Sequence, residues 1–410
     1  MTARASETFG GGGRRRCGWP KSASGLASLA VAAALALSAG GAQAAEKLII
    51  GSSFCLTGIQ AAFDDPSLKG AQVAVKALND AGGVLGREVE LINLDGKSDP
   101  VIVGNATVQV IEEGAEIVIA PCDFDFGSPA SREAQNAGLV GISTCASSPL
   151  YNSFTLGDKQ FTLSMWNHTM GAAAAEFALS KGWKNAWVVT DTFIDYTTSL
   201  SEFFITHLQN NGGTVLLEDK YTQGDQDFSA QLARLKGSEI KPDVLFISSY
   251  MPDMSTIIRT IREAGIDTPV LGGDSYDDGS LWAALGEKFG NEVYFVTHSF
   301  LSPEVKPEMG KFLELYRAYH GKDPDSAIAA TGWDTVMVLA QAIEAAGTTE
   351  GAALARKMEE LEFDLLTGKL DWSDAATGHE PDIEAALIQL VDGKPAFIGW
   401  TRPTNPPKPF

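Results

Sequence analysis

From residue 47 onward, short apolar segments alternate with longer amphipathic segments along the chain. The apolar segments are rich in valine, isoleucine and leucine and end in small or polar residues, which is typical of buried strands. We predict strands at 47–54, 88–95, 115–121, 139–143, 185–190, 214–221, 243–250 and 269–273. Their alternation with helix-length segments predicts βαβ units, in which parallel sheets are covered by helices on both faces.

The longer segments carry apolar residues at helical spacing, and most of them end at glycine. Prolines preceded by a capping residue mark three expected helix starts, at Asp65–Pro66, Asp99–Pro100 and Ser128–Pro129. Helices are predicted at 66–81, 100–114, 129–138, 199–213, 227–237, 254–265, 306–321, 326–347 and 351–363. After them, two or three strands are predicted within 368–400, with a turn at Asp392–Gly393.

The chain has 410 residues, which is more than one hydrophobic core usually organises. Two blocks of alternating strands and helices are followed by a mixed region. We therefore predict an α/β fold with two doubly wound parallel-sheet lobes.

One stretch after a predicted strand is unusual, because residues 143–148, "STCASS", are all small and four of them carry a hydroxyl. In open α/β sheets, ligands lie outside the carboxyl ends of the strands. Small residues there bring backbone and hydroxyl groups close to a bound molecule. The other predicted strand ends where a ligand could bind are 52–58, 121–128, 190–196, 248–253 and 272–278.

The first 44 residues have the features of a secretory signal peptide. Arginines at 14–16 precede an apolar run at 26–41 that is short for a membrane span, and Ala42–Ala44 is an A-x-A cleavage signal. We expect cleavage after about Ala44 and a location in the periplasm. The alternative is an uncleaved N-terminal anchor.

The chain is acidic, with a formal net charge of −21, and it becomes more acidic when the positively charged leader is removed. Such a surface repels nucleic acid and anionic membranes, so no nucleic-acid partner is expected. Outside the leader, no apolar run is long enough to span a bilayer.

Three cysteines remain after the leader: Cys55, Cys122 and Cys145. An odd number allows at most one disulfide and leaves at least one free thiol, and three buried free thiols are equally compatible with the pattern. The spacing fits no CxxC metal or redox motif.

Motifs of common enzyme classes are absent from the sequence after the leader. There is no G-x-S-x-G, no Walker loop, no H-E-x-x-H and no G-x-G-x-x-G after a strand. The acidic stretch 371–382 lacks the oxygen ligands that a calcium loop needs. We expect no enzymatic activity, no cofactor and no metal.

Three ordered blocks, at 70–100, 227–250 and 261–274, resemble the periplasmic leucine/isoleucine/valine-binding proteins. These are type I periplasmic binding proteins, the solute receptors of branched-chain amino acid ABC transporters. The resemblance implies a monomer whose two lobes are joined by three crossovers, a small-molecule solute closed between the lobes, and an inner-membrane ABC permease as partner. The expected division is a signal peptide at 1–44, lobe I at 45–165 plus 298–364, and lobe II at 166–297 plus 365–410.

The resemblance also assigns polar contacts to a ligand. Ser147 matches a hydroxyl residue that binds the ligand carboxylate through its side chain and backbone N–H. The carbonyl of Cys145 would accept from an α-ammonium, and Asp274 matches the acidic residue of the second lobe that pairs with it. The alternatives are a turn serine and an aspartate that caps the following turn.

The aromatic positions of the family correspond to Tyr196, Tyr250 and Phe63, although each could simply pack in the core. A second carboxylate-binding serine of the family is replaced here by Phe124, which keeps only its backbone N–H. The neighbouring Asp123 and Asp125 add negative charge. Ser98 and Asp123 stand where the family has a disulfide. These departures leave the fold and role intact but question a branched-chain ligand.

The resulting expectation is a receptor that binds an amino acid or related small amphipathic solute and delivers it to the permease. Three alternatives stay open: a receptor for an aromatic or other small carboxylate, a periplasmic sensor domain, and a hydrolase or transferase built on the same fold. Turnover of the bound solute would distinguish the last of these.

Overall fold

The computed structural model describes residues 46–225, 227–372 and 375–410. The predicted signal peptide lies outside the described residues. Within them, five parallel strands form a first sheet in the order β2-β1-β3-β4-β5. The strands are β1 (Leu48–Ser52), β2 (Val89–Asn93), β3 (Ile117–Ala120), β4 (Val140–Ser143) and β5 (Gln160–Thr162).

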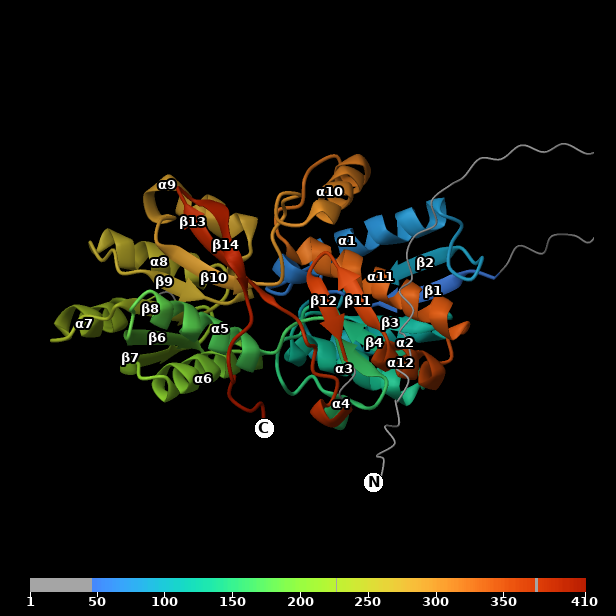
Figure 1. Ribbon diagram of the computed structural model, residues 1–410, viewed down its shortest axis with the longest axis horizontal. Helices are drawn as coiled ribbons and strands as arrows, with labels where there is room; N and C mark the ends of the chain where they lie inside the picture. Colours follow the sequence, from blue (N-terminus) through green and yellow to red (C-terminus); the bar gives the residue numbers. More distant parts are fainter. Residues whose placement is uncertain (1–45, 226, 373–374) are drawn as a thin grey trace, which may run out of the picture. The chain divides into compact units, whose positions relative to one another are not determined.

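Helices cover both faces of this first sheet (Figure 1). They are α1 (Ala61–Asp80), α11 (Ile328–Ala346) and α12 (Gly351–Glu360) on one face, and α2 (Pro100–Glu112) and α3 (Phe124–Asn136) on the other. Because side chains alternate along a strand, Ile117 and Ile119 of β3 pack with the first group, whereas Val118 and Ala120 pack with the second. This is the doubly wound arrangement that the sequence predicts.

The second sheet has seven strands in the order β14-β13-β10-β9-β8-β6-β7. They are β6 (Asn185–Asp191), β7 (Thr214–Tyr221), β8 (Val244–Ser248), β9 (Val270–Gly272), β10 (Val293–Thr297), β13 (Ala385–Val391) and β14 (Lys394–Thr401). The first five of these are parallel to one another, but β13 runs antiparallel to β10 and forms a hairpin with β14. The parallel-sheet lobes expected from the sequence are thus confirmed, and an antiparallel hairpin is added at this edge, with its turn at Asp392–Gly393 as predicted.

The second sheet is also covered on both faces (Figure 1). Its helices are α5 (Asn167–Ser180) and α6 (Asp195–Asn210) on one face, and α7 (Ser229–Gly237), α8 (Asp253–Glu263) and α9 (Gly279–Phe289) on the other. Val244 and Phe246 of β8 pack with α5 and α6, and the alternate residues Leu245 and Ile247 face α8 and α9.

The chain passes between the two sheets three times: after β5, after β10 and after β12. The remaining elements are α4 (Ser153–Leu156), α10 (Pro307–His320), β11 (Glu362–Leu365) and β12 (Gly368–Asp371). Leu370 and Trp372 pack in the same core as the first sheet, so the chain stays with that sheet beyond residue 364. Within 46–225, 227–372 and 375–410, no helix has the length and apolarity to cross a membrane.

Two predicted helix starts are wrong. α1 begins at Ala61 and α3 at Phe124, so Pro66 and Pro129 lie inside the helices. In both cases the first turn forms before the proline, because Asp64 N donates to Gln60 O and Gly127 N donates to Asp123 O. The third start is confirmed, with Asp99 accepting from the first-turn amides of α2.

Candidate functional site

Cys55, Cys122 and Cys145 lie side by side at the carboxyl ends of β1, β3 and β4. The β3–β4 register pairs Ala120 with Ser143, and Cys122 and Cys145 each follow at the same distance beyond these residues. They form a disulfide with a Cα–Cα distance of 4.8 Å, whereas Cys55 is a buried free thiol. The expected limit of one disulfide and one free thiol is thereby realised.

The carboxyl of Asp64, in the first turn of α1, bridges two of these strand ends by hydrogen bonds. Its Oδ2 accepts from Cys55 N at 2.7 Å and its Oδ1 accepts from Cys122 N at 2.8 Å. The carboxyl group is completely buried, and this burial raises the pKa of Asp64 to about 7. This residue was not among those predicted for the site.

The loop of small residues after β4 is held by its own hydroxyls and by the second lobe. Ser143 Oγ donates to Pro121 O at 2.8 Å and accepts from Ala146 N at 3.1 Å. Ser147 O accepts from Asn167 N, at the start of α5, at 2.6 Å. Ser147 itself is fully buried, and its Oγ has no hydrogen-bond partner among the described residues. This hydroxyl is therefore available to a ligand.

Three aromatic rings from both lobes pack together near the strand ends. Tyr196 and Tyr250 lie with ring centroids 5.4 Å apart, and Phe63 of α1 meets Tyr250 edge-on at 5.0 Å. Cys145 belongs to the same buried cluster. The structure thus brings together four of the residues that the resemblance assigns to the ligand.

Asp123 is placed at the centre of this region. It precedes α3 with φ 64° and ψ 148°, a conformation that residues with a Cβ seldom adopt and that costs about 1–3 kcal/mol. The Tyr250 hydroxyl donates to its Oδ2 at 2.7 Å. Burial raises the pKa of Asp123 well above its ordinary value, and the carboxyls of Asp274, Asp125 and Asp64 raise it further.

Asp274 follows β9 and is bound by a histidine from the next strand end. His298 Nε2 lies 2.8 Å from Asp274 Oδ2, and the register of β9 with β10 brings the two residues to the same edge. The next residue, Ser275, donates its N–H to the Tyr196 hydroxyl at 3.1 Å. Two buried polar atoms here, His298 Nδ1 and Ser275 Oγ, have no hydrogen-bond partner among the described residues.

Asn167 connects the serine loop to the aromatic cluster. Its N–H binds Ser147 O, and its side-chain amide donates to Tyr196 O at 3.1 Å. Asn167 thereby links Ser147 to Tyr196. Ser275, which follows Asp274 in the chain, links Asp274 to the same tyrosine. Phe124 is different, because its ring packs under the loop with Ala146 and Tyr151 rather than with Phe63 and the tyrosines.

A hollow of about 360 Å³ borders the aromatic cluster. It lies between the start of α1, the start of α9 and the segment before α11, and its lining residue Ala62 also packs against the cluster. This volume falls in the range of sites for small molecules. Of its three lining carboxylates, Asp65 and Asp325 are paired with lysines and Asp278 caps α9.

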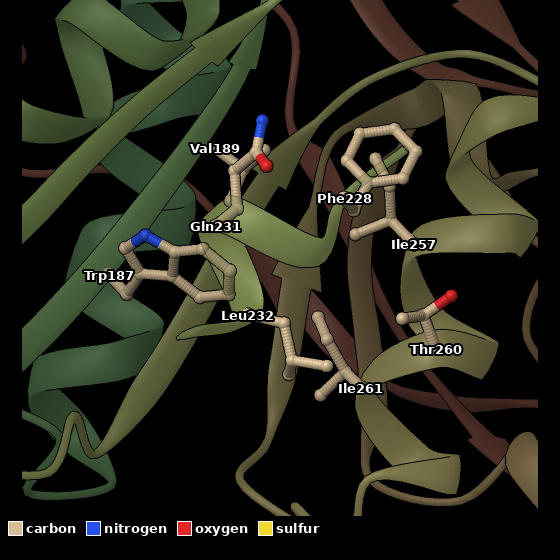
Figure 2. A pocket seen from close by; sticks show the side chains of 8 residues that line it. All are labelled: Trp187, Val189, Phe228, Gln231, Leu232, Ile257, Thr260 and Ile261. Carbon is tan, nitrogen blue, oxygen red and sulfur yellow. The ribbon is translucent and has the colours of Figure 1, made fainter. Parts of the chain in front are cut away.

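Figure 2 shows a second hollow, which lies within lobe II on the opposite face of the sheet from α5 and α6. Trp187 and Val189 of β6 face residues of α7 and α8 across it. Its volume is about 10 Å³, which is room for about one water molecule. It is too small for a solute. Across the described ranges, no group of three or more His, Cys, Asp or Glu side chains is arranged to hold a metal ion.

Sequence reasoning missed His298 and Asn167 as parts of this site. β10 was not predicted, and a strand at "VYFVT" would have placed His298 directly after a carboxyl end, next to Asp274. Asn167 carries no such signal, because its contacts depend on how the chain leaves the first sheet after β5.

The chain has clear relatives among known proteins. The sequence profile described as periplasmic binding protein matches residues 47–395. The Leu/Ile/Val-binding protein BraC3 of Rhizobium johnstonii is 26% identical over 351 residues, covering 85% of this chain and 92% of that protein. This chain therefore belongs to the periplasmic binding protein family.

Two solved structures illustrate the likeness. The leucine-binding protein LivK from Thermotoga maritima is 28% identical with a TM-score of 0.77, covering 87% of this chain and 99% of that one. A solute-binding protein of an ABC transporter from R. palustris, solved in complex with benzoate, is 22% identical with a TM-score of 0.76, covering 87% of this chain and 97% of that one. Both have the two-lobed α/β fold expected from the sequence.

Proposed function

We propose that this protein is the periplasmic receptor of an ABC transporter, which binds an amino acid or related small amphipathic solute between its lobes and delivers it to an inner-membrane permease. The observation that carries the proposal is the cluster of Phe63, Tyr196 and Tyr250, to which both lobes contribute at their strand ends. The cluster therefore joins the two lobes, since Phe63 comes from the first and the tyrosines come from the second. The names of the relatives, which include Leu/Ile/Val-binding and leucine-binding proteins, support the same role.

The two lobes would be the bodies that close. We propose lobe I as 46–165 plus 298–372 and lobe II as 166–297 plus 375–410, with the last crossover later than the sequence predicts because Leu370 and Trp372 pack with the first sheet. Closure would be a hinge motion about the three passages of the chain. A monomer is sufficient for this mechanism.

Within the site, each expected residue has a proposed role. Ser147 offers its buried hydroxyl, Cys145 its carbonyl and Asp274 its carboxyl to the polar groups of the solute. Phe63, Tyr196 and Tyr250 enclose its apolar part. For Phe124 only the backbone N–H is proposed, because its ring packs elsewhere.

The solute would be held and released unchanged. The groups near the aromatic cluster are carboxyls, hydroxyls and amides, which suit recognition by hydrogen bonds. Export by the N-terminal leader, with cleavage after about Ala44, would place the protein where an ABC permease takes up its solutes.

A thermal-shift screen across amino acids and aromatic acids tests the proposal. We expect at least one amino acid or close relative to raise the melting temperature, and Asp274→Ala to abolish that rise. Asp267→Ala, at an exposed position of lobe II, is the control and should retain it. A screen in which no small solute raises the melting temperature contradicts the proposal.

An aromatic or other small carboxylate is the second candidate ligand. The three rings favour it, and so does the benzoate complex of the R. palustris protein. In that case benzoate and related acids would give the largest shifts, and Asp274→Ala would leave those shifts in place.

A further inference from the structure

The carboxyl groups around the aromatic cluster come from both lobes and act on one another. Asp64, Asp123 and Asp125 belong to the first lobe and Asp274 to the second. The charges that act most strongly on Asp123 are the other three carboxyls, all of the same sign. The favourable contact of Asp123 is the neutral hydroxyl of Tyr250. These like charges therefore disfavour a further anion beside Asp123, although Asp274 is itself bound by His298 at 2.8 Å.

Asp123 is held where a solute would meet it. Its Oδ2 is bound to the hydroxyl of Tyr250, whose ring contacts both Phe63 and Tyr196. If a solute is enclosed by these rings, its polar end would lie near the bond between Tyr250 and Asp123. A ligand carboxylate in this position would be a buried like charge, whereas an N–H group could donate to the carboxyl.

Independent of the charges, several buried polar atoms beside the cluster lack a hydrogen-bond partner among the described residues. Among them are Ser147 Oγ, Ser275 Oγ and His298 Nδ1, on residues that are 0%, 2% and 0% exposed. Buried polar groups are almost always paired in folded proteins, so these atoms indicate contacts to a ligand. A hydroxyl can accept from an N–H group as readily as it can donate.

We propose that the site selects solutes that pair a small apolar or aromatic body with an N–H-rich head, such as an amine, amidine or amide, in place of a free carboxylate. This inference rests on the proposed solute-binding function and narrows its ligand class. The aromatic rings enclose the apolar part of the solute, and the carboxyls of Asp123 and Asp274 accept hydrogen bonds from its N–H groups. The opposite arrangement, a protonated Asp123 that donates to a ligand carboxylate, predicts the reverse order of affinities.

Matched pairs of probes that differ only in the head group test the inference. Binding to the mature protein is measured by calorimetry for benzamidine, benzamide and benzoate, and for leucinamide and leucine. We expect the N–H-rich member of at least one pair to bind at least about tenfold more tightly than its carboxylate counterpart. In Asp123→Asn this preference should fall at least about tenfold for the cationic probes.

Asparagine at 123 has the same shape and keeps an oxygen to accept from Tyr250, so the variant removes the charge and retains the contact between the lobes. Asp80→Asn, at an exposed ion pair with Lys76 at the end of α1, is the matched control and should leave the ratio unchanged. If the ratio of the affinity for the N–H-rich probe to that for its carboxylate counterpart is the same in wild type and Asp123→Asn, the role of Asp123 is overturned.

The outcomes separate the two proposals. If benzoate and leucine both bind as tightly as their N–H-rich counterparts, the inference is overturned and the solute-binding function stands. If no probe of either series binds, and protein prepared from the periplasm carries no small molecule that mass spectrometry detects, the proposed function is overturned and the inference falls with it.

Discussion

The hydroxyl of Tyr250, after β8, donates a 2.7 Å hydrogen bond to Oδ2 of Asp123, after β3. The two residues follow strands of different sheets, so this bond joins the lobes where the solute is proposed to bind. Removal of the hydroxyl leaves a buried carboxyl without this partner, at a cost of about 1–3 kcal/mol.

Tyr250→Phe is therefore expected to weaken solute binding by about 5–150-fold, because the lost bond joins the two lobes at the proposed solute site. Titration calorimetry with the best solute of the thermal-shift screen measures the change. Tyr294→Phe, which removes a hydroxyl bound to Glu292 on β10, is the control. Unchanged affinity in Tyr250→Phe would show that the bond does not contribute to closure.

The free energy of unfolding should fall as the pH rises from about 4 to about 7. Burial raises the pKa of Asp64 and of Asp334 to about 7, from an ordinary value of 3.8. The folded form of each binds its proton more tightly than the unfolded chain. Their contribution is thus complete below about pH 4 and is lost as the pH passes through the folded pKa.

Urea unfolding at pH 5 and pH 8 measures this effect, which should be on the order of 5 kcal/mol for the two groups together, in favour of pH 5. Carboxyls with a lowered pKa, such as Asp95 and Glu116, are ionised throughout this window and do not offset it. A free energy of unfolding that is higher at pH 8 than at pH 5 would contradict the prediction.

Asp64→Asn should destabilise the protein by about 1–3 kcal/mol. Both oxygens of Asp64 accept from backbone N–H groups, and an amide side chain would place its NH₂ against one of these donors. Asp65→Asn changes the adjacent residue, which is half exposed and paired with Lys69, and should alter the free energy of unfolding by less than about 0.5 kcal/mol. Equal effects of the two variants would exclude the bridging role of Asp64.

Two helical glycines should respond oppositely to alanine. A Cβ on Gly70 of α1 would overlap the carbonyl oxygen of Ala329 in α11, so Gly70→Ala should destabilise by at least about 2 kcal/mol. A Cβ on Gly104 of α2 would meet only the side chain of Pro129 at 3.7 Å, and the higher helix propensity of alanine should stabilise by about 0.5–1 kcal/mol. Thermal unfolding of both variants checks the signs.

The doubly wound fold could be predicted because its strands are short apolar segments separated by helix-length segments. The predicted strands at 47–54, 115–121 and 139–143 became β1, β3 and β4. The starts of α1 and α3 could not be predicted, because hydrogen bonds with the preceding loop extend each helix past its proline. Likewise, nothing in "AALIQLV" indicates that β13 would pair antiparallel with β10.

That the candidate residues follow strand ends could also be predicted, but the bonds between them could not. The stretch around Ser147 lies at the end of β4, and Tyr250 contacts both Phe63 and Tyr196. That Asp274 is bound by His298, and that Asp123 is bound by Tyr250, depends on the register of neighbouring strands and on contact between lobes. Sequence distance does not reveal either.

Native mass spectrometry of the mature protein isolated from the periplasm tests the central claim most directly. A receptor that closes on a solute should carry one small molecule per chain, which is lost on unfolding and regained when the refolded protein is mixed with a periplasmic extract. Tyr250→Phe should retain less of it than wild type. A mass equal to that of the polypeptide alone, both before and after exposure to the extract, would contradict the account.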